Sequence, residues 1–200
     1  MSGELIYAFR VMRLPLLDAG GAQIGKLDDI VVIPGRPGKG SDPAIPPRVV
    51  GFVASSQRRS IFVNANRIAT LDSDGARLRS WDVDLNPFKP RPGEVLIGQE
   101  LIDRKVGDET VSDIALREQT GSRSTFWVID RVRLSRKSSL RRRPSYRLVD
   151  YDEVPALFDY AARRLAARDA LRETMGLVIG DLVPATTALD PRYLVGLLRP

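Results

Sequence analysis

The chain of 200 residues contains neither cysteine nor histidine. Without cysteine it can form no disulfide, no thiolate nucleophile and no thiolate zinc site. Without histidine it lacks the most common general base and the most common transition-metal ligand. An enzyme built from this chain would depend on carboxylates, lysine, tyrosine or a bound cofactor. The composition therefore favours a protein that is not an enzyme and needs no cofactor.

Long apolar runs are also missing, since the longest falls well short of the roughly 20 residues that span a bilayer. The first ten residues, MSGELIYAFR, contain Glu4 and lack the basic start and apolar core of a signal peptide. We therefore expect a cytoplasmic protein without a transmembrane segment, which at most lies peripherally at a membrane surface. Hydrophobic residues make up 43% of the chain, enough for a core in each half.

Positive charge is concentrated in one segment. The chain carries a net charge of +6, and the segment from Arg131 to Arg147 holds eight basic residues and no acid, so the remainder is slightly acidic. The basic residues are Arg131, Arg133, Arg136, Lys137, Arg141, Arg142, Arg143 and Arg147.

This basic segment is the strongest candidate binding site. Strand alternation would place Arg131 and Arg133 on one face, with Val132 and Leu134 on the other. Such a row of guanidinium groups can bind the phosphates of RNA or anionic lipid head groups, although the segment lacks the interleaved aromatic residues of a single-strand binder. The alternative is a solvated hairpin, or a face paired with acids such as Asp150 and Glu153.

A faint internal repeat of about 85 residues indicates two related β-rich units. Three short blocks recur in the same order, with near-constant offsets of 85, 84 and 86 residues. They are Leu16–Asp18 with Leu101–Asp103, Asp29–Val32 with Asp113–Leu116, and Phe62–Leu71 with Leu148–Leu157.

Local patterns define the expected elements. Runs rich in β-branched and apolar residues predict strands at 24–33, 48–55, 61–63, 110–116, 125–135 and 146–149. Residues 66–71 are expected to form a short helical or turn segment. A helix over 158–175 is predicted, with Asp152 as its cap and Pro155 in its first turn.

These elements predict four regions. They are a first domain at 1–81, a proline-rich linker at 82–93, a second domain at 94–157 and a helical segment at 158–200. A second helix start at Asp190 is followed by barely two turns, so we expect the chain to be truncated before a larger helical domain. We expect the C-terminal helices to support self-association.

Three strings, LPLLDAGGAQIGKLDDIVVIPG, RVVGFVASS and IFVNANRIATLDSDGARL, together resemble a PRC-barrel domain over residues 10–80. Residues 94–157 look like a divergent copy, in which Glu109 and Thr110 stand where the first copy has Gly25 and Lys26. The resemblance implies a mainly β fold, with two small antiparallel PRC-like barrels in tandem followed by C-terminal α-helices. Such domains occur in the photosynthetic reaction centre H subunit and in the ribosome maturation factor RimM.

The whole order of segments resembles the N-terminal part of soluble actinobacterial proteins that continue into an MgtE-type intracellular N domain, often with CBS domains. This resemblance implies a regulatory role linked to magnesium, but it assigns no metal-binding residue to this chain.

Two local motifs are better explained by structure than by ligand binding. The run GGAQIGK at 20–26 matches most of a phosphate-binding loop, but Leu27 stands where serine or threonine is needed and a strand follows. Carboxylate pairs such as Asp28–Asp29, Asp72–Asp74 and Asp150–Asp152 could hold magnesium, yet most are typical of turns and helix caps.

The sequence therefore predicts a non-catalytic cytoplasmic regulatory or scaffold module that mediates protein–protein interaction. The alternatives are an RNA- or ribosome-associated factor similar to RimM, or an adaptor at an anionic membrane surface. Both alternatives would use the arginine-rich segment.

Overall fold

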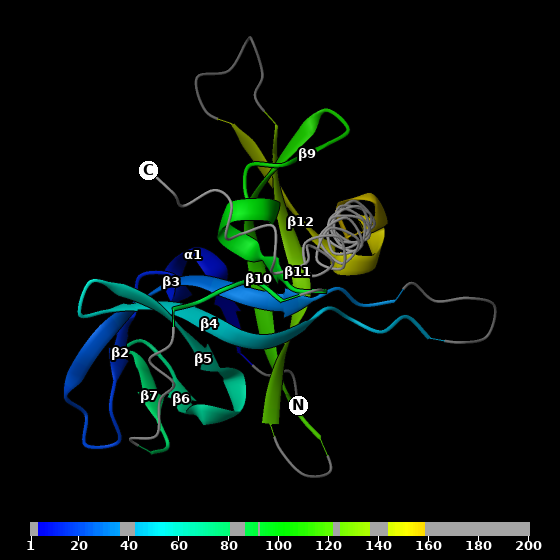
Figure 1. The fold of residues 1–200 in the computed structure, drawn as a ribbon. Helices are drawn as coiled ribbons and strands as arrows, with labels where there is room; N and C mark the ends of the chain where they lie inside the picture. Colours follow the sequence, from blue (N-terminus) through cyan, green and yellow to red (C-terminus); the bar gives the residue numbers. More distant parts are fainter. Residues whose placement is uncertain are drawn as a thin grey trace, which may run out of the picture. The chain divides into compact units, whose positions relative to one another are not determined.

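A computed structural model describes residues 4–36, 43–80, 87–91, 93–121, 125–136 and 144–158. Contacts divide the chain into a unit Met1–Ala162 and a unit Arg163–Pro200, and every described residue lies in the first. This part is mainly β, as expected (Figure 1). The predictions for Lys137, Arg141–Arg143 and the helices of 159–200 lie outside the described residues.

The described residues between 4 and 80 form seven strands and two short helical turns. In chain order these are β1 (Leu5–Tyr7), α1 (Ala8–Val11), β2 (Pro15–Leu17), β3 (Gln23–Ile33), β4 (Arg48–Ser56), β5 (Arg59–Asn64), η1 (Ala65–Arg67), β6 (Ile68–Leu71) and β7 (Ala76–Leu78). The described residues between 87 and 158 form fewer strands. Their elements are β8 (Val95–Leu96), η2 (Ile97–Leu101), β9 (Lys105–Val106), β10 (Glu109–Thr120), β11 (Thr125–Arg136), β12 (Ser145–Asp150), η3 (Tyr151–Glu153) and a helical turn at 155–158.

The six strands predicted from sequence are confirmed as β3, β4, β5, β10, β11 and β12. Three details were wrong. Residues 68–71 form a strand rather than a turn, because they pair with β7. Asp150, not Asp152, is the capping residue here: it caps the turn η3, in a capping box that Glu153 completes. Strand β10 runs to Thr120 instead of ending near 116, because its last residues pair with the start of β11.

Two long hairpins, β3–β4 and β10–β11, form the centre of the sheet (Figure 1). They cross, and they join where Arg48 of β4 pairs with Val128 of β11. Beside this pair, the Ile129 amide donates a hydrogen bond of 2.9 Å to the Pro47 carbonyl. Phe52 and Trp127 meet edge to face near the junction, with ring centroids 6.1 Å apart. The two hairpins therefore share one sheet and one core.

The two halves have the same strand order. In the first half the neighbours are β8, β3, β4 and β5, and in the second they are β1, β10, β11 and β12. Each central hairpin has two register shifts at corresponding places, with Asp28 and Val50 unpaired in the first half and Ser112 and Asp130 in the second. Shared irregularities at matching positions indicate a true structural repeat.

Register confirms two of the three sequence matches. The pair Val31–Gly51 corresponds to Ala115–Arg131, and Asn64 corresponds to Asp150, which reproduces the offsets of 84 and 86 residues. The match of Leu16–Asp18 with Leu101–Asp103 was wrong. Leu16 pairs with Gly25, and the residue that corresponds to Gly25 in the second half is Glu109. Glu109 pairs with Val106, so Val106 corresponds to Leu16.

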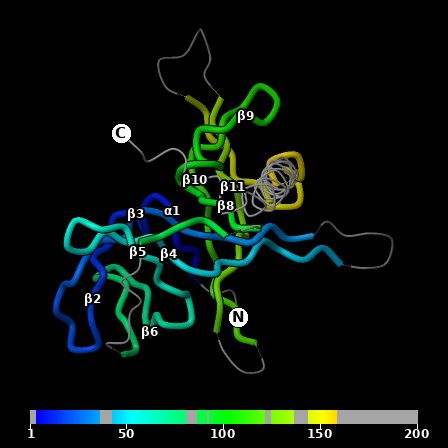
Figure 2. Tube along the Cα trace, viewed as in Figure 1, coloured from blue at the N-terminus to red at the C-terminus, as the bar shows by residue number. Residues whose placement is uncertain are grey.

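Each half receives a strand from the other side of the expected linker. Strand β1 precedes the first half yet pairs with β10, and β8 precedes the second half yet pairs with β3. Tyr7 beside Ala115 therefore corresponds to Leu96 beside Val31. Figure 2 shows the matching placement of β2 at the end of β3 and of β9 at the end of β10. Hydrogen bonding thus crosses the expected boundary at 82–93 in both directions.

Two buried aspartates hold this exchange in place. The Asp29 carboxylate on β3 accepts hydrogen bonds of 2.7 Å from the Gly98 amide and 3.1 Å from the Gln99 amide in η2. The Asp113 carboxylate on β10 accepts one of 3.1 Å from the Phe9 amide in α1. Burial raises the pKa of both carboxyls above the ordinary aspartate value. Each aspartate thus caps a helical turn that follows the strand donated to its own half.

Candidate binding surface on the second half

Four of the eight basic residues predicted as a binding site are described. Arg131, Arg133 and Arg136 lie on β11, and Arg147 lies on β12. The predicted alternation is confirmed, since Val132 and Leu134 are fully buried while Arg133 is exposed. The other four, Lys137, Arg141, Arg142 and Arg143, lie outside the described residues.

Three of these arginines are paired with acids. Arg131 Nε lies 3.1 Å from Asp150 Oδ1, in a cross-strand pair of β11 and β12. Arg136 contacts the Asp108 carboxylate. These are the paired-face contacts that the sequence left open as an alternative, although Asp108 was not among the acids named there. Glu153, which was named, instead accepts a hydrogen bond from the Asp150 amide.

Arg147 makes the most complete of these pairs. Its Nη2 lies 2.7 Å and its Nε 2.9 Å from Glu109 Oε2, and Nε also contacts Oε1 at 3.0 Å. This hydrogen bonding lowers the pKa of the Glu109 carboxyl. A guanidinium bound in this way has fewer donors left for a phosphate. The positive surface of the described hairpin is therefore smaller than its composition suggests.

Arg133 differs from the other three because it forms no ion pair with a described residue. Its guanidinium lies over the rings of Tyr7 and Tyr146, at 5.7 Å and 5.1 Å from the ring centroids. These distances are within the range of cation–π attraction. Tyr146 comes from β12, and Tyr7 comes from the exchanged strand β1. Tyr146 belongs to the basic segment itself, whereas Tyr7 is brought to Arg133 from outside it by the pairing of β1 with β10.

Exposed apolar atoms surround Arg133. Leu148 stands directly opposite Arg133 across the β11–β12 pair. The side chain of Leu148 is 40% exposed and that of Tyr146 is 56% exposed. We call the four side chains of Tyr7, Arg133, Tyr146 and Leu148 the Arg133 surface.

Strand β12 also offers a sheet edge. One side of β12 pairs with β11, and within the described ranges no segment pairs with its other side. An unpaired edge presents backbone amide and carbonyl groups that can accept a further strand. The Arg133 surface and this edge are adjacent because Tyr146 and Leu148 lie on β12.

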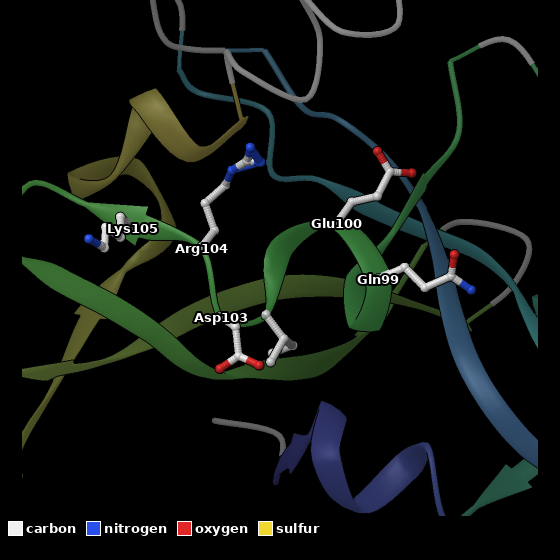
Figure 3. A pocket seen from close by; sticks show the side chains of 6 residues that line it. Gln99, Glu100, Asp103, Arg104 and Lys105 are labelled. Carbon is white, nitrogen blue, oxygen red and sulfur yellow. The ribbon is translucent and has the colours of Figure 1, made fainter.

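A pocket around η2 is less suited to bind a ligand. It is an open depression lined by Gln99, Glu100, Ile102, Asp103, Arg104 and Lys105. Figure 3 shows that the Asp103 carboxylate and the Arg104 guanidinium point away from each other, while Gln99 and Glu100 lie on the far side of the turn. Side chains that diverge in this way cannot surround one small molecule, so this depression is not our candidate.

Two motifs from the sequence have structural roles. In the GGAQIGK run, Gly21 has a positive φ of 91° in a tight turn that leads into strand β3. A phosphate loop would instead lead into a helix. The Asp72 carboxylate accepts hydrogen bonds from the Asp74 and Gly75 amides, as expected for a turn former. Over the described ranges, no three acidic residues gather in a way that could hold a metal ion.

Among the helices in the described part of the chain, none combines the length and the apolar character needed to cross a membrane. Comparisons with models of known protein families, with curated proteins and with solved structures find no match to this chain.

Proposed function

We propose that this chain is a non-catalytic regulatory or scaffold module that binds a partner protein through the Arg133 surface. The observation that carries the proposal is the exposure of Tyr146 and Leu148 around an arginine that stacks on two tyrosine rings and forms no ion pair with a described residue. Tyrosine and arginine are enriched at protein interfaces, where they contribute a large share of the binding energy.

The pairing of the other arginines favours a protein partner over a polyanion. Arg131, Arg136 and Arg147 are engaged with carboxylates that a phosphate chain would have to displace. The alternative functions, an RNA-associated factor or an adaptor at an anionic membrane, depend mainly on Lys137 and Arg141–Arg143. They remain predictions, because those residues lie outside the described ranges.

The fold proposed with this function is a tandem of two PRC-barrel-like units. The repeated strand order and the shared register shifts support two related units. The assignment to the PRC-barrel class rests on the sequence strings quoted above. The link to magnesium regulation and to an MgtE-type domain rests on that resemblance alone, and a cytoplasmic location fits the absence of cysteine.

Site-specific crosslinking in cells tests the proposal. A photoreactive phenylalanine analogue would replace Tyr146 in the full chain. The matched control would carry the same analogue at Arg59, an exposed position on the corresponding strand β5, one residue before the equivalent of Tyr146. After irradiation, we expect protein adducts from position 146 and few from position 59.

The nature of the adducts decides between the alternatives. A protein adduct that is lost when Arg133 is changed to Glu supports the proposal. Adducts that ribonuclease removes, or that contain lipid, would support an alternative instead. Equal adduct patterns from positions 146 and 59 would contradict the proposal, because the Arg133 surface would then have no preferred partner.

A further inference from the structure

The first half already shows how its own sheet edge is covered. Strand β5 corresponds to β12, and residues 87–91 lie along its outer edge, where Pro87 bridges to Ile61. The Phe88 amide donates a hydrogen bond of 2.8 Å to the Ser60 carbonyl. The chain thus contains an example of an extended segment added to this edge.

Side chains complete the cover in the first half. The Phe88 ring stacks on Phe62 at a centroid distance of 5.9 Å and an interplanar angle of 17°. The Arg91 guanidinium lies 5.1 Å from the centre of the same ring. Phe62 and Phe88 both pack against a buried cluster, which consists of Val31, Val53 and Leu96.

The Arg133 surface occupies the corresponding place in the second half. The register of β10, β11 and β12 gives the equivalent positions. Ala115 corresponds to Val31, Arg133 to Val53, Tyr7 to Leu96, Leu148 to Phe62 and Tyr146 to Ser60. No described segment takes the place of Phe88, and Tyr146 and Leu148 are exposed as a result.

One substitution changes the chemistry of the second surface. Val53 is buried beneath the covering segment, whereas Arg133 at the equivalent position carries a positive charge. A segment that covers this surface would place part of its chain close to a guanidinium that forms no ion pair with a described residue. A carboxylate in that segment would complement the charge.

We propose that the outer edge of β12 binds an extended, acidic segment of a partner protein by strand addition. One apolar side chain of the segment packs on Leu148, as Phe88 packs on Phe62. One carboxylate of the segment pairs with Arg133. The Tyr146 carbonyl accepts a backbone hydrogen bond, as the Ser60 carbonyl does. This inference rests on the proposed function, and it adds the binding mode and the kind of partner segment.

The positive charge of Arg133 and the strand pairing along β12 restrict which partner segments can bind. Main-chain hydrogen bonds supply affinity in strand addition, while side chains on alternate positions supply specificity. An acidic and apolar segment satisfies both Arg133 and Leu148, whereas a basic segment is repelled by Arg133.

A synthetic peptide tests this mode of binding directly. The probe is acetyl-Asn-Pro-Phe-Glu-Pro-Glu-amide, which follows the chain's own covering segment but replaces its two basic residues with glutamate. Binding to the full-length chain would be followed by NMR, through backbone shifts and amide hydrogen exchange. We expect the largest shifts, and slower exchange of outward-facing amides, on β12.

An N-methylated peptide separates strand addition from other binding. Methylation of the phenylalanine amide removes the donor for the Tyr146 carbonyl and keeps every side chain. We expect it to bind about tenfold more weakly or worse, because a backbone hydrogen bond is lost and an acceptor is left buried. Equal affinity of the two peptides would overturn strand addition, while the proposed protein-binding function would stand.

Protein variants test the side-chain contacts. Arg133→Ala should weaken binding of the probe about three- to fivefold, as expected for a partly exposed ion pair, and Leu148→Ala should also weaken it. Arg59→Ala removes the same charge elsewhere and should leave the affinity unchanged. Absence of probe binding at millimolar concentration, or an equal effect of Arg59→Ala and Arg133→Ala, would overturn the inference. Crosslinking at position 146 would then still report independently on the proposed function.

Discussion

Replacement of Asp29 by alanine should destabilise the sheet far more than replacement of its neighbour Asp28. The Asp29 carboxylate accepts three backbone hydrogen bonds, of 2.7 Å from Ile30, 2.7 Å from Gly98 and 3.1 Å from Gln99. Loss of a helix cap costs about 1 kcal/mol, and a buried amide left without an acceptor costs about 1–3 kcal/mol. We expect the free energy of unfolding to fall by about 3 kcal/mol, since both effects apply here.

This loss is large enough to measure by thermal unfolding. For a chain of this size it corresponds to a fall in midpoint of about 6–12 °C. Asp28→Ala is the matched control, because Asp28 is an exposed carboxylate one residue away. Surface substitutions usually change stability by less than about 0.5 kcal/mol. Equal falls in midpoint for the two variants would refute the capping role of Asp29.

The raised pKa of Asp29 also predicts how the free energy of unfolding changes with pH. Burial raises its pKa above the ordinary value of 3.8, so the folded state holds this proton to higher pH than the unfolded state does. The part of the stability that depends on this proton is therefore fully present below about pH 3.8 and is lost as the pH rises through the native pKa. The difference in unfolding free energy between wild type and Asp29→Asn should shrink across that interval. A difference that grows with pH would contradict the raised pKa of Asp29.

Three further predictions concern other contacts. Arg147→Ala should raise the pKa of Glu109 toward its ordinary value in a carbon-detected NMR titration, because the bidentate pair with Arg147 lowers that pKa. The stabilisation by this pair is lost as the pH falls through the lowered pKa. An unchanged pKa of Glu109 in the variant would contradict this reasoning. Trp127→Ala should cost about 3–5 kcal/mol in denaturant unfolding, because a buried ring against Phe52 leaves a cavity at the junction of the hairpins. Phe88→Ala should cost about 0.5–1.5 kcal/mol through the lost ring stack, and a neutral result would argue against the covered edge of the first half.

Much of the fold could be predicted from local patterns. Strands such as 24–33 and 125–135 are rich in β-branched and apolar residues. The repeat at Asp29–Val32 and Asp113–Leu116 was visible because both copies place an aspartate directly before three buried apolar residues of a strand. The pairing of β1 with β10 could not be predicted, since three residues of strand carry no signal for a partner more than a hundred positions away. The short match at Leu16 failed for the related reason that three residues define no register.

The candidate surface was predicted only in part. Charge composition pointed to Arg133, and strand alternation gave its exposed face. The sequence could not show that Glu109 would bind Arg147, because that contact depends on the register of separate strands. Tyr7 was missed for the same reason, although a lone tyrosine in an N-terminal strand was the available signal. A search for aromatic residues on every predicted strand would have retained it as a candidate.

The exchange of β1 and β8 has a consequence for the origin of this chain. A protein with only one of the two repeats would lack the strand that completes its sheet, and two copies could complete each other by mutual exchange, as domain-swapped dimers do. The pair of Arg48 and Val128 joins equivalent residues, which is where the two-fold axis of such a dimer would pass. Fusion of the two copies into one chain would make the exchange intramolecular, so that completing each sheet would no longer depend on protein concentration. It would also free the two copies to diverge, so that one surface could stay covered while the other acquired a charge.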